Sequence, residues 1–217
     1  MSANIRGLTP AKGQFKKALL RDTAETENVD IIVLTESHLN DSHLKGEVEI
    51  EGFENYRSDR AAGVIVYVKR FLIPGAELIS ANSIGNIEYL VLHLKLLDSL
   101  LITIYRPPNP ESADFKTVMG NISKNIEDLS QYLPRIILTG DLNFPSVNWD
   151  DYSIESCNRK TREQARMLLD LFENNFREQY IDKPTRVNNI LDIFATNDHE
   201  LVNDFDVICN DQRTSDH

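Results

Sequence analysis

Cysteine is scarce in this 217-residue chain, and so are long hydrophobic runs. Cys157 and Cys209 are too few and too far apart for a disulfide framework or for paired thiolate ligands, which favours a reducing compartment. No apolar run approaches the roughly 20 residues that a membrane helix needs, and the first residues lack the apolar core of a secretory signal. We therefore expect an intracellular protein that makes no membrane contact.

Positive charge is also in deficit, because 23 Lys and Arg residues stand against 34 Asp and Glu, for a net charge of −11. Proteins that bind phosphate backbones non-specifically are usually basic, since counterion release drives that binding. Either this chain binds nucleic acid weakly on its own, or its positive charge is local, or some carboxylates hold a cation. The motifs GxxxxGK[ST], HExxH and GxSxG are absent, so ATP-binding, zincin and serine-hydrolase functions find no support.

What the chain does contain is a series of apolar runs separated by fewer amphipathic segments. The runs predict strands at 29–36, 63–70, 88–97, 99–109, 135–141, 188–198 and 205–210. The amphipathic segments predict helices at 13–28, 112–133 and 161–176, the first with Phe15 and Leu19 on one face. Many strands with few helices predict layered sheets flanked by helices, within one domain at 1–217.

Polar residues stand where these apolar runs end. They are Glu36, Tyr105, Asp141 with Asn143 in the stretch RIILTGDLNF, Asp192 inside its run, and Asp216 with His217. Sites in layered proteins gather at strand ends, because the sheet holds the side chains rigidly while loops leave them open. The joint occurrence of these residues indicates a site.

Each residue also has a simpler structural interpretation, which the sequence leaves open. Asp141 and Asn143 could close a turn, Glu36 could cap one, Tyr105 could belong to the core, Asp192 could pair with Arg186, and His217 could be solvated.

The residue types point to phosphate ester chemistry. Oxygen ligands with one histidine and no paired thiols suit Mg²⁺ or Mn²⁺ and argue against zinc. A hard cation neutralises phosphoryl oxygens, an aspartate takes a proton from water, and a histidine and an amide stabilise the developing charge. Asp192 could orient His217 as the acidic member of a triad does.

A family resemblance joins these residues. The segments TESHLND, ITIYRPPN, ILTGDLNFPSVNWD, KPTRVNNILDIFATND and SDH, in this order, resemble the endonuclease/exonuclease/phosphatase superfamily. More narrowly, they are similar to the apurinic-type endonuclease domain that precedes reverse transcriptase in non-LTR retrotransposons. The resemblance implies an α+β fold, the DNase I-like four-layer α/β/β/α sandwich of two mixed sheets flanked by helices. It also implies a Mg²⁺- or Mn²⁺-dependent DNA endonuclease that leaves a 3′-hydroxyl for a linked or associated reverse transcriptase, acting in the nucleus.

The resemblance also implies a role for each residue. Glu36, Asn4 and Asp216 match positions at the metal, and Tyr105, Asn143 and Asn4 match contacts to the phosphate. Asp141 matches the general base or leaving-group aspartate. Asp192 matches the residue that orients the final histidine, His217, which stabilises the pentacovalent phosphate.

The chain departs from its relatives in two segments. Only Ala61-Ala62 stands where relatives carry a longer basic turn, and the sequence stops at His217 where relatives continue into a last strand. We therefore expect a domain that lacks its last C-terminal strand. Two alternatives to a DNA endonuclease remain: a phosphatase or phosphodiesterase acting on RNA or a phospholipid, and a truncated inactive domain that only binds.

Overall fold

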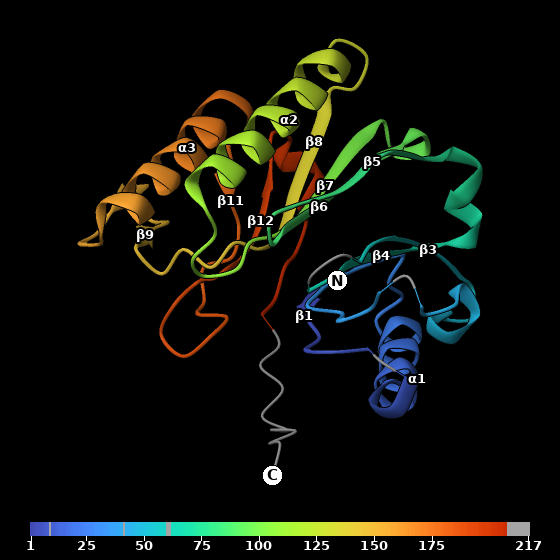
Figure 1. The fold of residues 1–217 in the computed structure, drawn as a ribbon. Coiled ribbons are helices and arrows are strands. Elements are labelled where there is room, and N and C mark those ends of the chain that lie inside the picture. The colour runs from blue at the N-terminus through green and yellow to red at the C-terminus, as the bar shows by residue number, and fades with distance from the viewer. Residues whose placement is uncertain (9, 41, 60–61, 208–217) are drawn as a thin grey trace.

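The structure is a computed structural model that describes residues 1–8, 10–40, 42–59 and 62–207. Asp216 and His217 lie outside these residues. Two β-sheets pack face to face, with α1 (Pro10–Thr26) on one outer side and α2 (Ser112–Ser130) and α3 (Arg159–Asn175) on the other (Figure 1). The predicted four-layer sandwich is confirmed.

The smaller sheet has four strands in the order β1-β2-β4-β3. Their bounds are β1 Ser2–Asn4, β2 Ile31–Thr35, β4 Val64–Lys69 and β3 Phe53–Ser58. β1 and β2 are parallel and the other pairs antiparallel, so the sheet is mixed. Ile32, Leu34 and Ile65 point to its outer side, where they pack with Leu20 and Ala24 of α1.

The larger sheet has six strands in the order β11-β12-β8-β7-β6-β5. Their bounds are β11 Glu178–Gln179, β12 Asp192–Thr196, β8 Arg135–Asp141, β7 Ser99–Tyr105, β6 Ile87–Leu94 and β5 Ala76–Ile84. Among the described strands of this sheet, β7 and β8 are the pair that run parallel, and α2 forms the crossover between them. Short elements complete the chain: η1 Lys45–Val48, η2 Arg70–Gly75, η3 Lys95–Leu97, β9 Val147–Asn148, β10 Ser153–Ile154 and η4 His199–Leu201.

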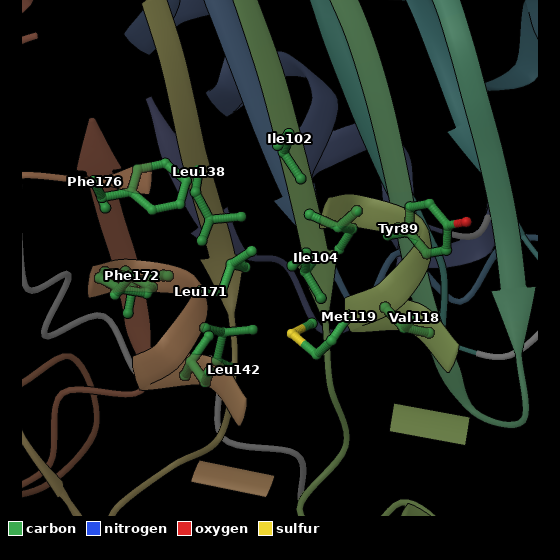
Figure 2. Close-up of a cluster of buried hydrophobic side chains, with 14 of the residues drawn as sticks. Tyr89, Ile102, Ile104, Val118, Met119, Leu138, Leu142, Leu171, Phe172 and Phe176 are labelled. Carbon is green, nitrogen blue, oxygen red and sulfur yellow. The ribbon is translucent and has the colours of Figure 1, made fainter. Parts of the chain in front are cut away.

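The outer face of the larger sheet carries the main core. Figure 2 shows Ile102 and Ile104 of β7 and Leu138 of β8 facing side chains of α2 and α3. Among these are Val118 and Met119 of α2 and Leu171 and Phe172 of α3. Because side chains alternate along a strand, the residues between these ones point into the layer between the two sheets.

That inner layer is apolar over most of its length and polar at one end. Its apolar part includes Val33, Val66, Leu92 and Leu101. Toward the ends of three strands, the residues that point inward become polar. They are Thr35 of β2, Thr103 and Tyr105 of β7, and Thr139 and Asp141 of β8. The polar end of the inner layer is where the predicted site lies.

Several sequence predictions need correction. β3 and β5 were missed because neither is a continuous apolar run: β3 mixes buried and half-buried residues, and β5 carries several polar residues and has no fully buried residue. On α1, Phe15 and Leu19 are 69% and 47% exposed, so the buried face is the one that carries Leu20 and Ala24. The strand predicted at 205–210 is wrong for residues 205–207, which are not in a strand, and its remainder lies outside the described residues.

In the described part of the chain, no helix is both long and apolar enough to cross a membrane.

Candidate active site

The site is built on one row of side chains that crosses the larger sheet. Asp192 of β12 is the register partner of Asp141 of β8, which is in turn the partner of Tyr105 of β7. Glu88 of β6 continues the row beyond Tyr105. Cross-strand partners share a face of the sheet, so all four side chains point into the inner layer. Asp141 is 2% exposed and Tyr105 is 7% exposed.

The smaller sheet contributes the opposite wall. The side-chain amide of Asn4, the last residue of β1, donates to Oδ2 of Asp141 over 2.9 Å. Glu36 directly follows β2, and its carboxylate is close enough to the Tyr105 hydroxyl to raise the pKa of that hydroxyl. Glu36 adopts φ +53°, a left-handed conformation that a non-glycine residue holds only where its surroundings enforce it. The two sheets therefore meet through polar contacts at this end.

The turn after β8 presents Asp141 and Asn143. The backbone N–H of Asn143 donates to Oδ1 of Asp141 over 3.1 Å, which closes the turn. Asn143 is in the left-handed region at φ +48°, and its side-chain amide donates to the carbonyl of Arg106 over 2.9 Å. The structural interpretation of this stretch as a turn is thus confirmed, and the same carboxylate also faces Asn4 in the inner layer.

The carboxyl groups of the site perturb one another. Burial and the nearby Asp192 raise the pKa of Asp141 from 3.8 to about 7, against the opposing effect of the hydrogen bonds from Asn4 and Asn143. Burial is also the main cause that raises the pKa of Asp192. The pKa of Tyr105 is raised by burial and then by the charges of Glu36 and Asp141. Such perturbed groups are typical of functional sites.

Contacts in the structure decide between the site interpretation and two simpler ones, the pairing of Asp192 with Arg186 and a capping role for Glu36. The backbone N–H of Asp192 donates to the Thr185 hydroxyl over 3.1 Å, and Thr185 lowers the pKa of the Asp192 carboxyl more than Arg186 does. One carboxylate oxygen of Asp192, Oδ1, is buried and has no hydrogen-bond partner among the described residues. Glu36 caps no helix, because the next one, η1, begins at Lys45 after Leu44.

A hard divalent cation fits this donor set. Within the described ranges, no three His, Cys, Asp or Glu side chains form a ready coordination group. Mg²⁺ does not need one, since it keeps several waters and takes one or two carboxylates. The carboxylate of Glu36 and the side-chain oxygen of Asn4 are the donors that would hold the cation, whose charge would offset the mutual repulsion of Glu36, Asp141 and Asp192.

The structure thus brings together six of the predicted site residues, from five strand ends. They are Asn4, Glu36, Tyr105, Asp141, Asn143 and Asp192. Asp216 and His217 lie outside the described residues, so their places stay predictions. Sequence reasoning missed Arg106, Gln164 and Thr185, which make hydrogen bonds to site residues or to one another, and Glu88, which continues the row across the sheet. An arginine directly after a buried strand was the available signal for the first of these.

The raised pKa of Asp141 predicts how metal-free protein responds to pH. The folded pKa of about 7 exceeds the ordinary value of 3.8, so the folded state keeps a proton that the unfolded chain releases. That stabilisation is complete below pH 4 and is lost as the pH rises toward 7. At about 1.4 kcal/mol for each pH unit, the loss in free energy of unfolding is at most about 4 kcal/mol.

Urea unfolding in EDTA at pH 5 and at pH 8 measures this loss. The wild type is expected to have a lower free energy of unfolding at pH 8 than at pH 5. In Asp141→Asn most of this difference should be absent, because asparagine does not titrate. An equal pH dependence in both proteins would show that Asp141 does not carry the effect.

Comparison with known proteins places the chain in a family. A family model described as endonuclease-reverse transcriptase matches residues 99–217, more than half of the chain. The chain therefore belongs to the endonuclease-reverse transcriptase family, which confirms the resemblance found in the sequence. No match was found among curated proteins.

Solved structures share the fold. The 3′ phosphatase NExo from Neisseria, bound to a product DNA hairpin, matches with a TM-score of 0.56 and 13% identity, over 90% of this chain and 84% of that one. The endonuclease domain of TRAS1, a telomere-specific non-LTR retrotransposon, matches with a TM-score of 0.55 and 14% identity, over 89% and 82%. The chain spans 49% of TDP2 from C. elegans, at 16% identity over 71% of this chain and a TM-score of 0.48. The first two likenesses establish the DNase I-like sandwich.

Proposed function

We propose that this chain is a divalent-metal-dependent phosphodiesterase, a DNA endonuclease that nicks its target and leaves a 3′-hydroxyl for reverse transcription to extend. The observation that carries the proposal is the hydrogen bond between Asn4 and Asp141, because it brings the ends of both sheets together around a group of buried carboxylates. The membership in the endonuclease-reverse transcriptase family supports the same function.

The chemistry is in-line attack of water on phosphorus. Asp141 accepts the proton of the attacking water as a new P–O bond forms, and the bond from phosphorus to the 3′ oxygen breaks. The leaving oxygen takes up a proton from water and becomes the 3′-hydroxyl. Mg²⁺ held by Glu36 and Asn4 would supply positive charge against the phosphoryl oxygens.

The remaining residues orient the phosphate. The Tyr105 hydroxyl and the amides of Asn143 and Asn4 are donors at the same end of the inner layer, where a phosphate oxygen would find them. One hydrogen of the Asn143 side-chain amide is donated to the Arg106 carbonyl, so a hydrogen bond to phosphate would use the second amide hydrogen.

Asp192 would orient His217, and the unpartnered Oδ1 of Asp192 suits that role. His217 would then stabilise the pentacovalent phosphate, and Asp216 would assist the metal or the water. These three roles are part of the proposal.

The partners follow from the same function. DNA would bind through its phosphates, and a linked or associated reverse transcriptase would add affinity that a chain of net charge −11 lacks. Action on chromosomal DNA would place the protein in the nucleus.

Nicking of supercoiled plasmid tests the proposal. We expect conversion to the open circle with Mg²⁺, none in EDTA, and a 3′ end that a polymerase extends without further treatment. Glu36→Gln should abolish the conversion without changing the circular dichroism spectrum.

Other outcomes point elsewhere. Metal-dependent cleavage of RNA, or release of phosphate from a phospholipid headgroup, without plasmid nicking would assign a different substrate. Folded protein that cleaves none of these substrates would contradict the enzymatic function and favour a binding domain.

A further inference from the structure

Arg106 is a fully buried cation that lies directly behind the site. It follows Tyr105, the last residue of β7, and is 1% exposed. Its guanidinium carbon lies 3.7 Å from the ring centre of Phe144 and 5.6 Å from that of Phe115. The side chain therefore occupies the outer core between the larger sheet and α2, on the far side of the sheet from the carboxylates.

This guanidinium holds the turn that carries Asp141 and Asn143. Nη1 donates to the carbonyl oxygens of Leu142 and Asn143 over 3.1 and 2.9 Å. The Arg106 backbone adds two more bonds, because its N–H donates to the Asp141 carbonyl over 2.9 Å and its carbonyl accepts from the Asn143 amide over 2.9 Å. Each residue of the turn thus has a hydrogen bond to Arg106.

A second set of contacts anchors the guanidinium itself. Nη2 donates to Oε1 of Gln164 on α3 over 2.6 Å. The amide of Gln164, in turn, donates to the carbonyl of Pro110 over 3.1 Å and to the hydroxyl of Ser112 over 3.3 Å. The turn is therefore connected through Arg106 to the start of α2 and to α3, which both pack on the outer face of the larger sheet.

The choice of a cation here is costly for stability. Burial lowers the pKa of Arg106 to about 10, which leaves it charged at neutral pH, and its three side-chain hydrogen bonds go to neutral oxygens. An apolar residue would cover Phe144 as well. Only the planar guanidinium group provides rigidly placed donors that can bond two consecutive backbone carbonyls and a glutamine side chain at the same time.

We propose that Arg106 is a positioning residue of this site, which holds the Asp141–Asn143 turn in its left-handed conformation so that the Asp141 carboxylate faces Asn4. This inference rests on the proposed nuclease function for its catalytic consequence. Without the two bonds from Nη1, only the bonds to the Arg106 backbone would still hold the turn, so Asn143 would keep φ +48° less firmly and its N–H would shift relative to Asp141.

Kinetics of three variants test the inference. Arg106→Met keeps the length and apolar contact but removes every side-chain donor, and we expect kcat to fall by about 10²-fold with KM little changed, as for a small displacement of a reacting group. Arg106→Lys should recover part of kcat, because an ammonium can still donate to the two carbonyls. Ile126→Ala is the matched control: it destabilises the same core from a distant turn of α2 and should keep the wild-type kcat.

Wild-type kcat in folded Arg106→Met, or an equal loss in Ile126→Ala, would overturn the inference. If the wild type nicks no DNA, the proposed function fails, and amide hydrogen exchange then decides the positioning role separately. Faster exchange at Leu142 and Asn143 in Arg106→Met, but not in Ile126→Ala, would support it. Unchanged protection there would refute it.

Discussion

Asp141→Asn is expected to lower the rate of plasmid nicking by roughly 10²–10⁴-fold, the usual contribution of a general base. Asparagine has the same shape but accepts no proton from water at neutral pH. Its carbonyl oxygen can still accept the Asn143 N–H, which now bonds Oδ1 of Asp141, so the turn is retained, while its NH2 group replaces Oδ2 and can no longer accept the Asn4 amide. The loss should therefore fall on the chemical step and not on folding.

A second measurement separates these two effects. In EDTA at pH 8 the variant should melt no lower than the wild type, because the substitution removes a buried negative charge beside Asp192 and Glu36. Asp128→Asn, the same change on the exposed side of α2, is the control and should nick at the wild-type rate. Nicking by folded Asp141→Asn at near the wild-type rate would refute the assignment of the base.

Gly140→Ala is expected to remove several kcal/mol of stability and nicking activity together. Gly140 has φ +135°, which L side chains rarely adopt, and it pairs with Ile104 of the neighbouring parallel strand. An added Cβ would collide with the Ile104 carbonyl oxygen and lie 2.9 Å from its carbonyl carbon. Backbone in the middle of a sheet cannot move aside, so the strand must shift and Asp141 with it, at a cost of about 3–5 kcal/mol.

The control for this substitution is Gly120→Ala. Gly120 lies in α2, and an added Cβ there would meet nothing within 4 Å. Alanine should therefore stabilise the helix by about 0.8–1 kcal/mol and leave nicking unchanged. Thermal unfolding of both variants with plasmid nicking at 25 °C measures the contrast. Wild-type stability in Gly140→Ala would show that β8 accommodates a side chain next to Asp141.

The apolar runs predicted the strands that are buried on both faces. β2, β4, β7 and β8 are continuous apolar segments because helices or the other sheet cover each side. The strands β3 and β5 were not predictable in this way, since their outer positions are partly exposed and carry polar residues. The sequence of α1 misled for a similar reason: among its described side chains, the buried ones are Leu20 and Ala24, which form a narrow face.

The site was predictable as a set of strand ends, but its geometry was not. Polarity at the ends of apolar runs identified Glu36, Tyr105 and Asp141. Which of them share a face depends on strand register, which local sequence does not specify for pairs as distant as Asn4 and Asp141. Arg106 was missed because hydrophobic patterning assigns an arginine to the surface, and only the tertiary structure shows its buried acceptors.

The hydrogen bond between Asn4 and Asp141 spans 137 positions of the chain and links one sheet to the other. Neither sheet alone contains both halves of the site, so secondary structure can form completely while the active arrangement is still missing. We therefore expect nicking to require the docking of the two sheets, and contacts so distant in sequence form slowly. Recovery of nicking during refolding would report that docking event, which neither helix content nor the burial of one sheet would reveal.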